Sequence, residues 1–257
     1  MKDWKSAVIT YNDKTITIND IYKYIDILYT NVDVDEYNYY QAHALRYLIT
    51  LDYVIKYNLY KGKVLEVGGG GFFTYLMKDI LGIDIVNFSD DLRKPIELDK
   101  DQFDVIICME VIEHIIDNDA FSLFTFKGLA VMLNSFWNLL KEDGKVLITT
   151  PNSCGLFAMS KLLNSKSPLM FVFHAREYTP YEVKKILRSF NYEIDALTTE
   201  CAFDKHYKKN KMLNLLRDNL FNLKYRGDDI FVVARKPAKT EINADVNISD
   251  VLINEDT

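Results

Sequence analysis

The sequence predicts an α/β fold in which helices cover both faces of a parallel sheet. Short apolar runs alternate with segments of helical periodicity between residues 61 and 151, an order that is typical of parallel sheets with helical crossovers. Several of these runs are apolar on successive residues, as expected of strands that are covered on both faces. A chain of 257 residues has room for one such domain together with insertions or a small cap.

Residues 1–60 are expected to form a helical cap. A first helix is predicted to begin at residues 18–20 and to reach Leu28, and a longer one to run from Asp35 to Ile55. The longer segment has apolar residues at helical spacing, at Leu45, Leu48, Leu51 and Val54. Two interpretations stay open, because these side chains can pack on the main domain or can support a lid over a cofactor or substrate.

The main domain is expected to span residues 61–236, and its first half contains four predicted strands. They are Val64–Val67, Ile83–Phe88, Val105–Met109 and Val146–Thr149. Helices are predicted at Phe73–Ile80 and Phe121–Leu140. The stretch between Phe88 and Phe103 is too short for both a full helix and a further strand, so we expect the sheet to be shortened between its second and fourth strands.

The second half of the main domain is interrupted by two expected insertions, at about residues 152–177 and 198–227. Thr179 is a candidate N-cap, with Pro180 at the first position of a helix that ends at Ser189. Two further strands are predicted, at Tyr192–Leu197 and Ile230–Ala234.

A run of four glycines follows the first strand of the domain, in the segment Glu66-Val67-Gly68-Gly69-Gly70-Gly71-Phe72-Phe73. Glycine lets the backbone turn sharply and lets a ligand approach closely. Free N–H groups at the start of the following helix favour polar or anionic ligand groups, and ligands of open α/β sheets bind at the carboxyl ends of the strands. A dinucleotide site needs a third glycine where Phe73 stands, and a P-loop needs a Gly-Lys-Ser/Thr sequence that does not follow. A tight turn without a ligand is the remaining alternative.

The acidic–apolar–Gly–x–Gly pattern resembles motif I of the class I S-adenosylmethionine-dependent methyltransferases. In that family the residue at Glu66 orients the loop, and Gly68 and Gly70, with Gly69 between them, border the amino-acid end of the cofactor. The third glycine that is usual in this motif falls on Phe72 here, which bears on the shape of the loop. The resemblance implies a Rossmann-like sheet, S-adenosylmethionine as cofactor, and methyl transfer.

Further segments resemble later motifs of the same family, so that the resemblance covers roughly residues 61–236. These segments are Asp91–Ile96, Phe103–His114, Leu140–Asn152 and His174–Thr179. The family places an acidic side chain after the second strand on the ribose hydroxyls, and either Asp90 or Asp91 can take that role. Asp91 also fits the carboxylate that contacts the adenine amino group, and Glu110 is expected to line the cofactor site.

Three chemically active residues, Glu110, Glu113 and His114, follow the central strand Val105–Met109. In a helix, the i, i+3, i+4 spacing places them on one face. Methyl transfer from a sulfonium needs mainly alignment of acceptor, methyl group and sulfur, and a histidine can accept a proton from an acceptor hydroxyl. His114 and His174 are therefore the candidate catalytic residues.

The same side chains also form a candidate metal site. Two carboxylates and two imidazoles can hold a divalent cation with open positions for a substrate hydroxyl. The Glu-x-x-Glu-His…His order resembles metal-dependent small-RNA 3′-terminal 2′-O-methyltransferases, and ubiquinone-biosynthesis O-methyltransferases have a related segment. This resemblance implies Mg²⁺, Mn²⁺ or Zn²⁺ on Glu110, Glu113, His114 and His174. In the alternative, Glu113 and His114 open a helix in a metal-free enzyme and His174 is a hydrogen-bonded loop residue.

Composition limits the partners and the compartment. The net charge of −6 argues against broad binding of nucleic acid, although Lys205–Arg226 is locally basic and could meet phosphate on a nucleotide-sugar, an RNA end or a lipid surface. Three widely spaced cysteines indicate no disulfide framework. With no signal-like start and apolar runs too short for a bilayer, a cytoplasmic enzyme without a transmembrane segment is expected. The polar, acidic tail at 237–257 is expected to be disordered.

The acceptor is expected to be a hydroxyl on a small molecule or on a sugar of a polysaccharide precursor, such as a nucleotide-sugar. This expectation rests on the His-x-Arg-Glu-Tyr-Thr segment, which resembles enzymes of bacterial polysaccharide and natural-product pathways. Two other functions stay open: a metal-dependent RNA 2′-O-methyltransferase, and a non-catalytic S-adenosylmethionine-binding protein.

Overall fold

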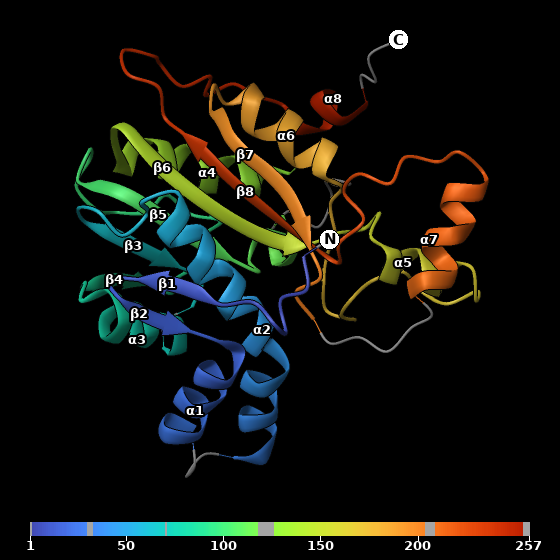
Figure 1. Ribbon diagram of the computed structural model, residues 1–257. Coiled ribbons are helices and arrows are strands. Elements are labelled where there is room, and N and C mark those ends of the chain that lie inside the picture. The colour runs from blue at the N-terminus through green and yellow to red at the C-terminus, as the bar shows by residue number, and fades with distance from the viewer. Residues whose placement is uncertain (1, 30–32, 70, 118–125, 204–208, 254–257) are drawn as a thin grey trace.

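The computed structural model describes residues 2–29, 33–69, 71–117, 126–203 and 209–253. The larger of the two sheets in this part of the chain has the strand order β4-β3-β5-β6-β8-β7 (Figure 1). Its strands are β3 Val64–Val67, β4 Ile85–Phe88, β5 Phe103–Met109, β6 Leu140–Pro151, β7 Glu193–Glu200 and β8 Asp229–Arg235. β4, β3, β5 and β6 pair in parallel, whereas β8 is antiparallel to both of its neighbours. The expected α/β sheet is therefore confirmed.

Helices cover both faces of this sheet. The described helices are α1 Ile18–Tyr29, α2 Val34–Lys56, α3 Phe72–Leu76, α4 Lys127–Leu139, α5 Leu156–Leu162, α6 Pro180–Ser189, α7 Lys209–Asp218 and α8 Ile248–Ile253. A π-helical turn, η1 at Met77–Leu81, extends α3, and a 3-10 turn, η2 at Ile112–His114, follows β5. A small hairpin of β1 Ile9–Tyr11 and β2 Lys14–Ile16 precedes α1. The expected helix start at Phe121 lies outside the described residues.

The core has two layers because successive side chains of each strand point to opposite faces. Ile107 of β5 packs with α1, α2 and α3 in one layer, whereas its neighbours Ile106 and Cys108 pack with α4 and α6 in the other. All three side chains are fully buried. A strand that buries both faces reads as a continuous apolar run, and this explains why the central strands could be located from the sequence.

The N-terminal helices share a continuous core with the sheet. α2 begins after Asp33, whose side chain caps the helix by accepting from the backbone N–H of Asp35 at 2.8 Å. From Ala44 to Leu51 every residue of α2 is buried. The second half of α2 is thus an internal helix, and it lies against the same sheet face as α3.

The sheet is shortened where the sequence indicated. Residues 89–102, which are described throughout, form neither a helix nor a strand between β4 and β5. β4 is consequently the edge strand next to β3.

The expected insertions contribute α5 and α7, which lie together beyond the carboxyl ends of the parallel strands (Figure 1). Leu156 of α5 and Met212 and Leu216 of α7 form a small core of their own. None of the helices that the structure describes is long and apolar enough to cross a membrane.

The tail differs from the disorder expected for residues 237–257. The described part, up to residue 253, returns over the face covered by α6, and α8 packs against that helix. Ile248 is almost fully buried in the second core layer, and Ile242, Val246 and Leu252 pack against the same layer. A few apolar side chains at suitable spacing anchor this segment, although its average composition is polar.

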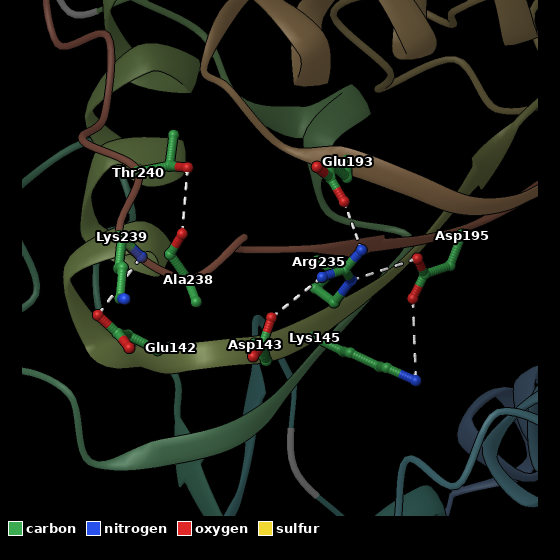
Figure 2. A network of polar contacts seen from close by, with 9 residues as sticks. All are labelled: Glu142, Asp143, Lys145, Glu193, Asp195, Arg235, Ala238, Lys239 and Thr240. Carbon is green, nitrogen blue, oxygen red and sulfur yellow. Dashed lines mark hydrogen bonds and ion pairs between the residues drawn. The ribbon is translucent and has the colours of Figure 1, made fainter.

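An ionic network joins the last three strands at the end of the sheet opposite the carboxyl edge (Figure 2). Arg235 of β8 contacts Asp143 of β6 at 3.0 Å and also Glu193 and Asp195 of β7. Lys145 lies 3.8 Å from Asp195. These side chains are partly exposed, so each pair contributes roughly 0–1 kcal/mol.

Helix α6 begins with the cap that the sequence predicted. The backbone N–H of Glu182 donates to Thr179 Oγ1 at 3.2 Å, and the backbone N–H of Thr179 donates to Glu182 Oε2 at 2.7 Å. Pro180 occupies the first turn, where its missing N–H has no helical partner to lose.

Replacing Thr179 with Ala is expected to lower the free energy of unfolding by about 1 kcal/mol, because the helix loses its capping oxygen. Denaturant unfolding measures the change. Thr179→Ser is the matched control, since it keeps the hydroxyl and should retain most of the stability. Equal losses in the two variants would show that packing of the Thr methyl group, and not the cap, accounts for the effect.

Candidate active site

The glycine loop leaves β3 through a backbone conformation that favours glycine. Gly68 has φ +78°, and its N–H donates to the carbonyl of Phe88 in β4 at 3.0 Å. A Cβ atom at Gly68 would lie only 2.2 Å from Val111 Cγ2. Position 68 therefore requires glycine for two reasons, and it brings the loop into direct contact with the segment after β5.

The other glycines of the loop have different surroundings. Gly69 does not have a left-handed φ, and the nearest atom to a Cβ there would be Glu66 Oε1 at 3.8 Å. Gly71 has φ +124° and precedes α3, with the hydroxyl groups of Tyr29 and Tyr40 close by. Gly70, also predicted to bind the cofactor, lies outside the described residues.

Glu66 links the strand to the helix across this loop. Its buried carboxylate accepts a hydrogen bond from the Thr74 hydroxyl of α3. Burial raises the pKa of Glu66, and the bond from Thr74 opposes that rise. The contact holds the ends of the glycine loop at a fixed separation.

The two aspartates after β4 differ in their partners and in their exposure. Asp91 forms a bidentate pair with the Arg93 guanidinium, at 2.7 and 3.0 Å. The hydrogen bonds from Arg93 lower the pKa of Asp91 to about 2. Asp90 is exposed. Of the two predicted ribose ligands, Asp91 already has both oxygens engaged by a cation.

Glu110 has an unusual backbone conformation at the end of β5. Its φ of +54° is left-handed, which costs a non-glycine residue on the order of 1–3 kcal/mol and is concentrated at functional sites. Its N–H donates to the carbonyl of Thr149 at 3.0 Å, and its Oε1 accepts from the Thr149 hydroxyl at 2.7 Å. The Glu110 carboxylate is thereby directed toward β6 and α2.

The cation that faces Glu110 is Arg46 of α2, which is 3% exposed. Arg46 Nη1 lies 3.8 Å from Glu110 Oε1. Burial alone lowers the pKa of Arg46, but Glu110 and neighbouring tyrosines outweigh it, so the pKa lies above its ordinary value. Arg46 is consequently charged in this site.

A second buried acid, Asp229, lies at the start of β8 and interacts electrostatically with both Arg46 and Glu110. Neither of its carboxylate oxygens has a hydrogen-bond partner in the described part of the chain. Burial raises the pKa of Asp229 well above its usual value, and the Glu110 charge adds to the rise. Because β8 is antiparallel to its neighbours, its first residue reaches the edge at which the parallel strands end.

The structure brings three of the four predicted metal ligands together. Ligand atoms of Glu113, His114 and His174 lie within 4.8 Å of one another. The His114 and His174 rings meet edge to face, with centroids 4.7 Å apart. Glu110, the fourth predicted ligand, is outside this group because its carboxylate faces Thr149 and Arg46. The donor set of the cluster is one carboxylate and two imidazoles.

The surroundings of this cluster orient each side chain. Glu113 is fully buried; its Oε2 accepts from the Thr150 hydroxyl at 2.8 Å, whereas no described residue gives Oε1 a hydrogen-bond partner. Burial raises the pKa of Glu113 well above its usual value, and the Glu110 charge adds to this. Burial lowers the pKa of His114, and His174 lowers it further.

His174 is fixed by Glu177 of the same loop. Its Nδ1 lies 2.6 Å from Glu177 Oε1, so Nε2 is the ring nitrogen left for a ligand. The loop is docked on the segment after β5, because the backbone N–H of Ala175 donates to the carbonyl of Glu113 at 2.8 Å. A carboxylate behind an imidazole is the usual support of a metal-binding or catalytic histidine.

Sequence reasoning missed Arg46, Glu177 and Asp229. Arg46 could have been found as a single cation within the apolar stretch from Ala44 to Leu51. Glu177 was part of a recognised segment but had no assigned role. Asp229 stands directly before an apolar strand, a position where an acid is often only solvated.

Comparison with known proteins fits this geometry. A family model described as a methyltransferase domain matches residues 37–197, more than half of the chain. The chain belongs to the methyltransferase family. The match begins within α2 and ends within β7, so it includes the glycine loop, the segment after β5 and the loop that carries His174.

Solved structures of methyltransferases share the fold of this one. An S-adenosylmethionine-dependent methyltransferase from Archaeoglobus fulgidus aligns with TM-score 0.50 and 16% identity, over 74% of this chain and 94% of the other. A possible histamine N-methyltransferase from Thermotoga maritima aligns with TM-score 0.52 and 16% identity, over 82% and 98%. No curated protein matches the sequence. The family model confirms the expected methyltransferase, and the solved structures confirm its Rossmann-like fold.

Removing the buried cation tests the charge balance of the site. Arg46→Met is expected to lower the free energy of unfolding by about 3 kcal/mol, because Glu110 then lacks its compensating charge. The double variant Arg46→Met/Glu110→Gln should regain much of that loss, as denaturant unfolding of both proteins would show. If the second substitution adds to the loss, the two groups do not compensate each other.

Proposed function

We propose that this methyltransferase transfers the methyl group of S-adenosylmethionine to a hydroxyl on a small molecule or on a sugar of a polysaccharide precursor. The observation that carries the proposal is the position of Glu113, His114 and His174 beside the glycine loop. β5 is the direct neighbour of β3, and Gly68 touches Val111. A cofactor bound on the loop therefore has the polar cluster next to it.

For the cofactor, we assign Glu66, Gly68, Gly69 and Gly70 to the amino-acid end. Asp90 is the better candidate for the ribose hydroxyls, because Arg93 already occupies both oxygens of Asp91. Glu110 lines the same edge of the sheet. Tyr29 and Tyr40 stack with ring centroids 3.9 Å apart next to Gly71, which supports the interpretation of α1 and the start of α2 as a lid.

The acceptor hydroxyl must lose a proton when it becomes an ether, and His114 and His174 are the candidate bases. Burial keeps the pKa of His114 low, so its imidazole is neutral near neutral pH and can accept a proton. The Glu177 carboxylate holds the His174 ring in place.

Alternatively, Glu113, His114 and His174 fit a divalent cation such as Mg²⁺, Mn²⁺ or Zn²⁺, and the two imidazoles then act as ligands and not as bases. The fit rests on the unpartnered Glu113 Oε1 and on the carboxylate behind His174. One carboxylate with two histidines is a donor set that such ions accept with positions left open. A bound cation supplies Lewis acidity, which eases deprotonation of a coordinated hydroxyl.

The sugar or small-molecule acceptor follows from the segment His174–Thr179 and its resemblance to enzymes of polysaccharide and natural-product pathways. The possible histamine N-methyltransferase with the same fold makes amines the natural comparison class. Nucleotide-sugars and simple amines are therefore to be tested side by side.

Cofactor binding is expected to depend on Gly68. Calorimetry should show micromolar binding of S-adenosylmethionine to the protein, about −8 kcal/mol, and at least tenfold weaker binding to Gly68→Ala, because the new Cβ displaces Val111. The matched control is Gly82→Ala, which also introduces Ala at a positive φ but into open space. Its affinity should equal that of the unaltered protein. Failure of the unaltered protein to bind either S-adenosylmethionine or S-adenosylhomocysteine would contradict the cofactor assignment.

Metal binding is tested on a pair of variants. Glu113→Gln is expected to abolish Mn²⁺ binding in calorimetry, whereas Glu110→Gln should keep it, because Glu110 lies outside the cluster.

The acceptor class is tested by turnover. Formation of S-adenosylhomocysteine should appear with nucleotide-sugars rather than with amines. Undiminished turnover in EDTA would exclude a required metal, and turnover with amines alone would exclude O-methylation.

A further inference from the structure

The two insertions carry an unusual share of exposed apolar side chains. We call the described residues 152–177, 198–203 and 209–227 together the insertion unit. Half of the large apolar side chains that are exposed in the described chain lie in this unit, which is about a fifth of the sequence. They are Leu162, Leu163, Phe171, Val172, Phe173, Leu215, Leu220, Phe221 and Leu223. A contiguous patch of exposed apolar groups marks an interaction surface, and within this unit the rings of Phe171 and Phe173 are in direct contact.

The insertion unit is also basic, whereas the rest of the protein is strongly acidic. It contains eight Lys and Arg residues and three Asp and Glu residues, so its formal charge is +5 within a chain of charge −6. The remaining residues therefore carry −11. An anionic surface attracts this unit and repels the remainder, which gives the protein a preferred orientation.

The described parts of the unit are tied to one another. Arg226 Nη1 donates to the carbonyl of Cys154 at 2.9 Å, which joins the exit of α7 to the entry of α5. Lys161 of α5 donates to the carbonyl of Leu169, two residues before the exposed apolar loop at residues 171–173. The small core of Leu156, Met212 and Leu216 packs α5 against α7 within the same unit.

The apolar loop at residues 171–173 borders the active site. The Phe171 ring lies 5.6 Å from the His174 ring and 5.1 Å from the Phe173 ring, between centroids. Val172 and Phe173 are 76% and 72% exposed. A surface that covers this loop is therefore next to the two histidines.

We propose that the insertion unit docks the protein on an anionic membrane surface, with Phe171, Val172 and Phe173 entering the interface between headgroups and acyl chains. Exposed apolar side chains on a unit of net positive charge are the combination that binds such a surface. RNA is less suited, because its phosphates would match the charge but would leave aliphatic side chains such as Leu162 and Leu220 in water. Docking favours an acceptor held at the bilayer surface; only that consequence rests on the proposed function.

Co-sedimentation with vesicles of equimolar phosphatidylglycerol and phosphatidylcholine tests the docking without cofactor or acceptor. The unaltered protein should bind these vesicles, and should bind vesicles of phosphatidylcholine alone at least tenfold less. The triple variant Phe171→Ser/Val172→Ser/Phe173→Ser should lose at least tenfold in binding. The matched control is Ile27→Ser/Val34→Ser, because both side chains are 69% exposed but lie on α1 and α2; it should bind as the unaltered protein does.

A reporter variant keeps the test independent of how the triple variant folds. Trp placed by Val172→Trp should shift its fluorescence to the blue on vesicle addition, and Trp placed by Ile27→Trp should not. Absence of vesicle binding, equal losses in the triple variant and its control, or equal shifts in the two reporters would overturn the proposal. Binding to an RNA oligonucleotide without binding to vesicles would also overturn it, in favour of the alternative partner.

Discussion

The close approach of β3 and β5 is the constraint on which the site depends. The two strands pair in parallel, so both end at the same edge, and the contact of Gly68 with Val111 leaves no space for a side chain between them. The glycine loop and the Glu/His segment are therefore held against each other by the backbone. Because S-adenosylmethionine carries an activated methyl group, alignment of the partners is the main task of the enzyme, and this pairing provides the rigid frame for it.

Charge compensation sets a second requirement at this edge. Glu110, Glu113 and Asp229 are acids in a largely buried region. Burial raises the pKa values of Glu113 and Asp229, and the buried cation Arg46 opposes that rise. Burying an unpaired charge is costly. Arg46, which reduces this cost, comes from α2 and is distant in sequence from the three acids. The N-terminal helices are thus part of the electrostatic design of the site as well as a cover for it.

The loop that carries His174 contains both a candidate site residue and an exposed apolar stretch. Its backbone is docked on Glu113, and its Glu177 holds the histidine ring. The same loop exposes Phe171 to Phe173 a few residues earlier. A partner that contacts this apolar stretch lies next to His174, because the Phe171 and His174 rings are 5.6 Å apart between centroids. The proposed docking surface and the proposed catalytic histidine thus belong to one short segment.

Five features could be predicted from the sequence alone: the sheet strands, the shortened region, the α6 cap, the glycine loop and the Glu/His segment. These features are local: continuous apolar runs reveal buried strands, and glycine and capping residues act on their immediate neighbours. Three other features are visible only in the folded protein: His174 lies beside Glu113 and His114, Glu110 faces Arg46, and the polar tail packs through Ile248. Each of these outcomes depends on residues distant in sequence that strand order and helix docking bring together. Local patterns carry no information on such distances, and for this reason the sequence groups Glu110 with Glu113, although its carboxylate faces Thr149 and Arg46.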